Sequence, residues 1–528
     1  MTEPTVNGVA ESKPKPGLQP IQTGDYPGIP NTDSPTTSTA GGGGGNPFDE
    51  IIPHPDEVHH RNLILCFDGT GDQFDADVRD WSRLTEYTCY NSNIVQFFSM
   101  LKRDDITQQL VYYQAGIGTY TIPEIAKPWD AALQKTLDMM LGSHLDAHIM
   151  GGYEFLMQNF KTGDKIFIFG FSRGAYTARA LAGMYIGLLP PCNHQQVPFA
   201  YKMYTREDET GWNQSNAFKK TFSIDVDIEF VGVWDTVGSV GILPGRRLPF
   251  TKSNSHIRFF RHAISLDERR ARFKVNLWNR PTEAEHKKGI KKGTMPRHKT
   301  DKSHKRSLND LEKQFTDDDR PTDIEEVWFS GAHCDIGGGS VGNGTRHNLA
   351  RIPLRWMVRQ CFILRTGILF HKNMFKDIGL DPDTLYPHVL PRPPPVPYTP
   401  DCLAHKYEHP VNFATSDGGT VKIVEPFINE EEEDLLDALT PIYDQLKLAK
   451  GWWILEVIPN KQRYQKEDDS WTHTLSINFG GPRIIPKQSK IGVKVHRSVK
   501  VRMEAETLFK DKKYTPAAKL DVEPTWID

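Results

Sequence analysis

Cysteine, net charge and long apolar runs are all scarce in this sequence. Six cysteines occur among 528 residues, and none has a C-x-x-C spacing, so neither a disulfide framework nor a structural zinc site is expected. Acidic and basic residues nearly cancel to a formal net charge of −3, which gives no electrostatic reason to expect nucleic acid as a partner. The apolar stretches are no longer than strands and the mean hydropathy is −0.52, so no transmembrane segment is predicted.

The first residues, MTEPT, do not begin an apolar segment of the kind that secretory signals carry. Because a secretory signal and a disulfide framework are both missing, the sequence predicts a cytoplasmic protein.

Composition shifts along the chain predict its organisation. The predicted parts are a disordered tail rich in Pro, Gly, Ser and Thr over 1–58, a catalytic domain over 59–380, a Pro-rich connector over 381–400, a C-terminal extension over 401–510 and a tail over 511–528. A basic insertion interrupts the catalytic domain at 281–323, with nine Lys or Arg between His286 and Arg306 against one acid, Asp301. This insertion is expected to be a flexible solvated loop, with peripheral contact to an anionic membrane surface or an acidic partner as the alternative. The C-terminal extension is expected to pack on the catalytic domain or to cap it.

Short apolar runs alternate with helical segments from Arg61 onward. Strands are predicted at 62–67, 109–114, 166–169, 228–234 and 326–331. Nearly continuous apolar strands separated by helices predict an α/β fold with a mostly parallel sheet covered on both faces. Later in the chain, residues 430–446 predict an acidic amphipathic helix and residues 452–457 a buried apolar segment.

One motif has the form of a nucleophile elbow. The residues GFSRG at 170–174 lie between the apolar run 165–169 and a small-residue segment at 175–183. Strand, tight turn and helix in that order present a serine, here Ser172, at the carboxyl end of a sheet. A second G-x-S-x-G match contains Ser340 but continues into glycine-rich loop sequence, so a structural or site-lining role is expected for Ser340.

Each predicted strand ends in polar residues, and these would meet at one edge of a parallel sheet. The chain order Ser172, Asp235, His333 is the order of nucleophile, acid and base in an α/β-hydrolase. His333 would then take the Ser172 proton, and Asp235 would orient the imidazole and stabilise its charged form. The backbone N–H of Arg173, with that of Gly69 or Thr70, would form the oxyanion hole.

Other roles stay open for several of these residues. His496 is the rival base, because it comes late in the chain. Asp235 could cap the turn that follows it, and Asp68 could line the site or bond its own turn. Asp335 is expected to line the site. His262 is expected to be structural, on the edge of a helix.

Taken together, the strand-end motifs resemble a known family. They are FDGT at 67–70, Asn93-Ile94, Tyr113 with GIGT at 116–119, GFSRGAYTAR at 170–179, GVWDTVG at 232–238 and GAHCDIGGG at 331–339. In this order they are similar to the α/β-hydrolase family DUF2235, which is related to the catalytic domains of Tle1-type phospholipase effectors of type VI secretion. The resemblance covers about residues 60–370, and more loosely 400–505. It implies a Ser-Asp-His lipolytic or esterase site at Ser172, Asp235 and His333. The N-terminal tail, the basic insertion and Cys334, where serine is commonest, depart from the family pattern.

These observations predict a serine hydrolase of carboxylic esters that uses neither metal nor cofactor, with small-molecule or lipid esters, phospholipids included, as substrates. A metal-dependent phosphohydrolase is the second hypothesis, in which Asp68, Asp235, His333 and Asp335 would ligate a divalent cation. A non-catalytic interaction protein on a hydrolase scaffold is the third.

Overall fold

The computed structural model describes most of the chain after residue 49. The described ranges are 50–69, 90–116, 145–184, 187–206, 209–224, 226–238, 248, 251, 254, 256–278, 322–343, 345–399, 427–466, 471–505 and 513–528. They all belong to one unit, Pro47–Asp528. The predictions for Thr70, for the tail over 1–49 and for the basic insertion over 281–321 lie outside the described residues.

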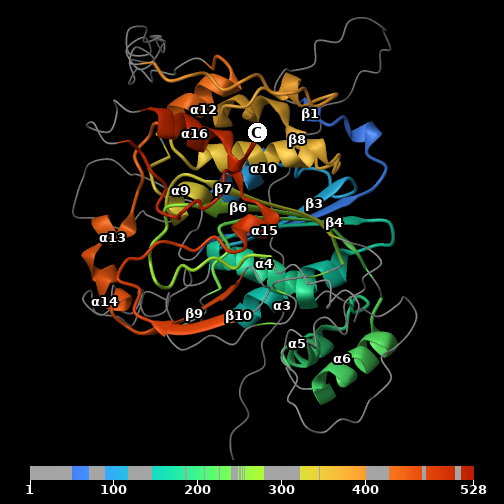
Figure 1. Cartoon of the computed structure of the whole chain (residues 1–528). Helices are drawn as coiled ribbons and strands as arrows, with labels where there is room; N and C mark the ends of the chain where they lie inside the picture. The colour runs from blue at the N-terminus through green and yellow to red at the C-terminus, as the bar shows by residue number, and fades with distance from the viewer. Residues whose placement is uncertain are drawn as a thin grey trace, which may run out of the picture. The chain divides into compact units, whose positions relative to one another are not determined.

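A parallel sheet of eight strands forms the centre of this unit (Figure 1). Its strands are β2 (Asn62–Phe67), β3 (Gln109–Gln114), β4 (Lys165–Phe171), β5 (Ile228–Trp234), β6 (Ile257–Ser265), β7 (Asp323–Phe329), β11 (Lys494–His496) and β12 (Thr525–Ile527). The order across the sheet is β12-β11-β7-β6-β5-β4-β2-β3, and each neighbouring pair is parallel. The predicted α/β architecture is therefore confirmed.

Helices cover both faces of the sheet (Figure 1). The helices that the structure describes are α1 (Asn93–Met100), α3 (Leu145–Asn159), α4 (Ser172–Met184), α5 (Val197–Tyr204), α6 (Glu209–Phe222), α9 (His333–Gly337), α10 (Arg351–Ile363), α12 (Glu430–Ala438), α13 (Gln445–Leu448), α14 (Trp453–Glu456), α15 (Gln488–Ile491) and α16 (Arg497–Glu504). Side chains of one strand alternate between the faces. In β2, Leu63 and Leu65 join the core cluster with α3 and α4, whereas Ile64 and Cys66 join the cluster with α1 and α10. Among the described helices, none is long and apolar enough to cross a membrane.

The sequence did not predict the strands β6, β11 and β12. His262 lies within β6 and is fully buried, so its predicted place on a helix edge is wrong. The reason is that polar side chains inside β6 find buried partners. The His262 ring accepts from the Thr236 N–H through Nε2 at 3.1 Å and donates from Nδ1 to Glu326 at 3.0 Å.

Buried ion pairs join α10 to α12. Arginines at 351, 355 and 359 of α10 recur every fourth residue and pair with Glu430, Glu433, Asp434 and Asp437 of α12. The acidic helix predicted at 430–446 ends at Ala438, and a separate short helix, α13, follows. The acids of α12 face arginines inside the protein, because a guanidinium can compensate the cost of burying a carboxylate.

The prediction of a buried segment at 452–457 is wrong. The short helix α14 buries Leu455, which is 8 % exposed, but leaves Trp453 at 41 %, Ile454 at 69 % and Val457 at 50 % exposed. One turn of helix can bury only one side against the domain, so a continuous apolar run there leaves the opposite side in solvent. The antiparallel hairpin of β9 (Asn460–Gln465) and β10 (Trp471–Ser476) follows α14. A second small antiparallel pair joins β1 (Ile51–Ile52) to β8 (Phe370–His371).

Candidate active site

Ser172 occupies a tight, strained turn between β4 and α4. Its φ is +59°, a left-handed conformation that is costly for a residue with a side chain. The flanking glycines are required sterically. A Cβ on Gly170 would lie 2.6 Å from the Gly174 carbonyl oxygen, and a Cβ on Gly174 would lie 2.3 Å from the carbonyl oxygens of Phe67 and Asp68. The local geometry is therefore that of a nucleophile elbow.

The structure brings the predicted nucleophile, base and acid together. His333, the first residue of α9, places Nε2 2.7 Å from Ser172 Oγ. Its Nδ1 lies 2.5 Å from Oδ2 of Asp235, the residue that follows β5. Ser172 and His333 are 3 % exposed and Asp235 is fully buried. The sheet register explains the proximity, because β4 and β5 are neighbours and pair Phe171 with Trp234 immediately before Ser172 and Asp235.

Three residues donate hydrogen bonds to the Asp235 carboxylate: His333, Ser265 and Arg483. Its Oδ1 accepts the Ser265 backbone N–H at 3.0 Å. Arg483 donates to both carboxylate oxygens, at 2.5 Å and 2.8 Å. The other N–H groups of Arg483 bond the carbonyl oxygens of Phe273 and Ser265. All five guanidinium N–H donors are thus engaged, and the carboxylate has a single orientation.

Arg483 is the main residue of the site that the sequence did not indicate. It follows Gly480, Gly481 and Pro482 in a loop without strand or helix pattern, and it lies 248 positions after Asp235. No local signal in the sequence distinguishes it from a surface arginine.

Burial and charge set the protonation of the pair formed by Asp235 and His333. Burial would raise the pKa of Asp235, but the Arg483 charge and the bond to His333 hold that pKa well below its usual range. Burial lowers the pKa of His333; Asp235 acts in the opposite direction, and Arg270 lowers the pKa further. At neutral pH the site therefore contains an aspartate anion and a neutral imidazole, the form that can accept a proton.

Aromatic and charged groups pack around the imidazole. Phe171 and Phe273 place their ring centroids 4.8 Å from the His333 ring. The His333 backbone N–H donates to the Glu268 carboxylate at 3.2 Å, and Glu268 pairs with Arg270 at 2.8 Å. These contacts fix the imidazole orientation from both the ring and the backbone.

The predicted oxyanion-hole donors lie in different environments. The Gly69 N–H donates to the carboxylate of Asp68 at 2.7 Å. That carboxylate also accepts from Ser92 Oγ at 2.6 Å and from Tyr113 Oη at 2.7 Å, and its burial raises the pKa of Asp68. Arg173 is the second residue of α4, where backbone N–H groups have no acceptor within the helix. The Gly69 N–H is thus already bonded to Asp68, and the oxyanion role of the first turn of α4 stays a prediction.

Asp335 and the rival base His496 are engaged elsewhere. Asp335 accepts the backbone N–H groups of Ala332 and Tyr443 at 2.9 Å and 3.0 Å, and burial raises its pKa to about 6. The His496 ring lies 2.8 Å from Ser498 Oγ and stacks on Phe329. Burial lowers the pKa of His496 to about 3. Asp335 thus holds the start of α9, and His496 caps α16.

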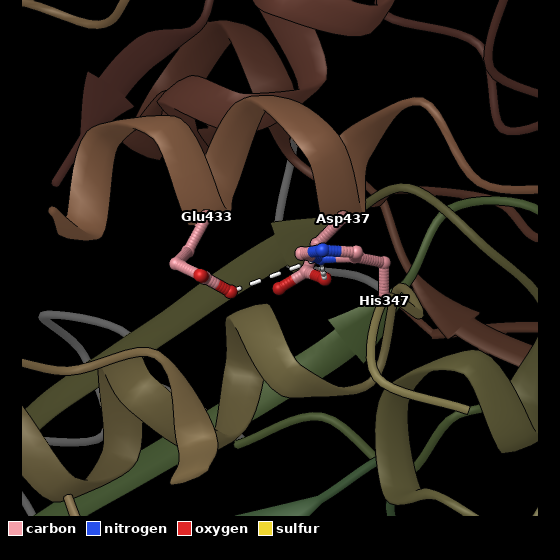
Figure 2. A group of neighbouring side chains, drawn as sticks. All are labelled: His347, Glu433 and Asp437. Carbon is pink, nitrogen blue, oxygen red and sulfur yellow. Dashed lines mark hydrogen bonds and ion pairs between the residues drawn. The ribbon is translucent and has the colours of Figure 1, made fainter. Parts of the chain in front are cut away.

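One group of three candidate metal ligands occurs in the described part of the chain, away from these residues. His347, Glu433 and Asp437 point toward one another, and their ligand atoms lie within 4.8 Å (Figure 2). The same carboxylates, however, bind guanidinium groups: Arg351 lies 2.8 Å from Glu433, and Arg355 lies 2.7 Å from Asp437. A cation at this position would be repelled by these guanidinium charges, so the cluster fits an ion-pair network better than a metal centre.

A family model matches the part of the chain that contains these residues. The family model described as the catalytic domain of Tle1-like phospholipase effectors of type VI secretion matches residues 61–360. The chain belongs to this Tle1-like family. The matched range contains Ser172, Asp235 and His333, and it stops before Arg483.

Several proteins are similar to this Tle1-like chain. The yeast protein YEL023C, described as uncharacterized, from Saccharomyces cerevisiae, is 26 % identical over 590 residues, covering 88 % of this chain and 81 % of that protein. An uncharacterized protein from Pseudomonas aeruginosa of known crystal structure is 20 % identical, with a TM-score of 0.29, over 58 % of this chain and 46 % of that one. The Tle1 effector bound to the VgrG spike is 19 % identical, with a TM-score of 0.25, over 53 % and 51 %. The chain thus spans about half the length of these two solved proteins.

Proposed function

We propose that this protein is a serine hydrolase that cleaves carboxylic esters of lipids by an acyl-enzyme mechanism. The observation that carries the proposal is the chain of contacts from Ser172 Oγ through both nitrogens of His333 to the Asp235 carboxylate. Lipid esters are proposed as substrates because the description of the family names phospholipase effectors.

Acylation would begin with attack of Ser172 Oγ on the ester carbonyl carbon. His333 Nε2 accepts the hydroxyl proton, and Asp235 stabilises the resulting imidazolium through Nδ1–H. The carbonyl oxygen becomes an oxyanion, to which the first N–H groups of α4, including that of Arg173, would donate. Collapse of the tetrahedral intermediate breaks the bond to the alkoxide, which takes the proton from His333 and leaves as the alcohol.

Deacylation would repeat the same proton transfers with water. His333 accepts a proton from the attacking water, and the second tetrahedral intermediate releases the carboxylic acid as Ser172 recovers its proton. Since each step needs neutral imidazole at its start, the lowered pKa of His333 supports the role of base at neutral pH.

The hydrogen bonds in the site favour this mechanism over a metal-dependent phosphohydrolase. Three of the four metal ligands in that hypothesis already accept hydrogen bonds. Asp235 accepts them from Arg483 and His333, and Asp335 accepts them from two backbone N–H groups. Asp68 accepts them from Ser92, Tyr113 and its own turn. A divalent cation would have to displace these donors. The paired serine and imidazole also disfavour a purely structural scaffold, which has no need of them.

The test is covalent labelling and ester hydrolysis with chelator present. A fluorophosphonate probe should label the wild type and Ser340→Ala, the serine of the other G-x-S-x-G match, but not Ser172→Ala. Wild type should release p-nitrophenol from a short-chain ester and fatty acid from a phospholipid mixture, and Ser172→Ala should release neither. Activity that disappears with chelator, or that Ser172→Ala retains, would refute the serine mechanism.

A further inference from the structure

An exposed apolar patch surrounds α14, on the same side of the domain as α13 and the β9–β10 hairpin (Figure 1). The α14 patch consists of Leu448, Trp453, Ile454, Val457, Leu475 and Phe479, which are 62 %, 41 %, 69 %, 50 %, 68 % and 63 % exposed. Single exposed apolar residues are ordinary, but several large ones on two segments that are hydrogen-bonded to each other mark a surface that binds something.

Buried contacts hold the two segments of the patch together. Glu456, 1 % exposed, accepts the Gly480 N–H on its carboxylate at 2.9 Å, and its carbonyl oxygen accepts the Phe479 N–H at 3.2 Å. The indole N–H of Trp453 donates to the Leu446 carbonyl at 2.9 Å. The hydrogen bonds of Glu456 and Trp453 therefore fix the backbone of the patch, and its apolar side chains are exposed.

The exposed charged side chains within residues 444–458 are lysines, because Asp444 is buried and pairs with Arg269. Lys447 and Lys450 are exposed, and the one acid between residues 445 and 466 is the buried Glu456. Residues 471–500 contain no acid.

We propose that the α14 patch docks the protein onto an anionic lipid bilayer. Exposed Trp and aliphatic side chains beside lysines are typical of surfaces that insert into the boundary between headgroups and acyl chains. Lysines near an anionic membrane add electrostatic attraction. A protein partner is disfavoured because lysine is depleted from protein interfaces. The inference rests on the proposed function, because a lipid ester substrate is held in a bilayer.

The patch is also connected to the candidate active site. Trp452, the residue before α14, contacts Phe273 edge to face with ring centroids 5.5 Å apart, and Phe273 contacts His333 at 4.8 Å. The Arg270 guanidinium covers the rings of both Phe273 and Trp452, at 3.5 Å and 4.8 Å. Docking through α14 would thus place the bilayer surface beside Trp452, and Phe273 connects Trp452 to His333, the proposed base.

The test measures vesicle binding by the full chain carrying Ser172→Ala, so that lipid is not consumed. Co-sedimentation with phosphatidylcholine:phosphatidylglycerol (7:3) vesicles should exceed that with phosphatidylcholine alone. Ile454→Ser should lower the partition coefficient about tenfold, whereas Ile106→Ser, at a 62 % exposed position near β3, should stay within twofold. The pair Lys447→Ala and Lys450→Ala should lower it about 25-fold at low salt, roughly fivefold for each lysine.

Three outcomes would overturn the docking proposal. They are no binding to phosphatidylglycerol vesicles, equal losses for Ile454→Ser and Ile106→Ser, or a dimer that Ile454→Ser converts to monomer with vesicle binding unchanged. The lysine variants keep the test valid if Ile454→Ser fails to fold, because both lysines lie on the surface. Hydrolysis of a water-soluble ester by the chain with Ser172 intact separately tests the proposed function, since vesicle binding requires no catalysis.

Discussion

Replacing Arg483 by glutamine is expected to damage both stability and catalysis. The change removes a cation whose side chain is 2 % exposed and leaves the Asp235 carboxylate, 0 % exposed, without its bidentate partner. Breaking a buried pair by removing one partner costs about 3–5 kcal/mol in the free energy of unfolding. With an unfolding entropy of about 2.1 cal/mol/K per residue, each kcal/mol corresponds to roughly 1 °C in a protein of this size. Arg483→Gln should therefore lower Tm by about 3–5 °C.

The same variant should shift the pH dependence of catalysis. Without the guanidinium, the negative charge of Asp235 acts on His333 with less compensation, so the pKa of His333 rises. Since the neutral imidazole is the active form, the acidic limb of kcat/KM should move to higher pH. Arg483→Lys should give an intermediate result, because it keeps the charge but loses the forked geometry.

Melting curves and kcat/KM for a soluble ester between about pH 4.5 and 9 are the measurements for these two predictions. Arg258→Gln is the matched control, because Arg258 pairs with Glu229 at 62 % side-chain exposure, where an ion pair contributes about 1 kcal/mol or less. A Tm for Arg483→Gln within 1 °C of wild type, together with an unmoved acidic limb, would refute the reasoning.

Further expectations concern the three central residues. Asp235→Asn should lower kcat/KM by about 10³- to 10⁴-fold with the backbone retained, because asparagine accepts the φ of +40° found there; an effect below tenfold in steady-state kinetics would contradict the assigned role. Ser172→Gly should be more stable to urea than Ser172→Ala by about 1 kcal/mol, because glycine relieves the strain at φ +59°; equal stability would argue against strain. In the wild type, the acidic limb of kcat/KM should be centred below pH 6.5, the usual pKa of histidine, because burial lowers the pKa of His333; an acidic limb centred above pH 6.5 would contradict this sign.

The strands nearest the site were predictable because they are buried on both faces. Such strands are uninterrupted apolar runs, so β2 and β5 have the predicted bounds. The half-buried edge strand β3 also has its predicted bounds, because its apolar residues lie between two glutamines. Each is followed by a polar turn, and parallel strands bring these turns to one edge of the sheet. That is why Ser172, Asp235 and His333 could be proposed together from sequence.

What the sequence did not predict depends on partners distant along the chain. β6 contains Arg261 and His262, which look unsuited to a core strand until Asp323 and Glu326 of β7 are placed beside them. The acids of α12 look solvent-facing until the arginines of α10 are opposite them. Periodicity describes the neighbours of a residue along the chain, and it carries no information on a compensating charge from another segment.

The position of Arg483 has a consequence for how the protein is made. Residues 61–360 contain the serine, the histidine and the aspartate, yet the cation that binds Asp235 and the strands β11 and β12 come more than a hundred residues later. On the ribosome the nascent chain holds all three residues well before it can neutralise the buried aspartate. Synthesis itself therefore delays assembly of the site, and a chain that ends before Arg483 would contain the aspartate without the cation that binds it.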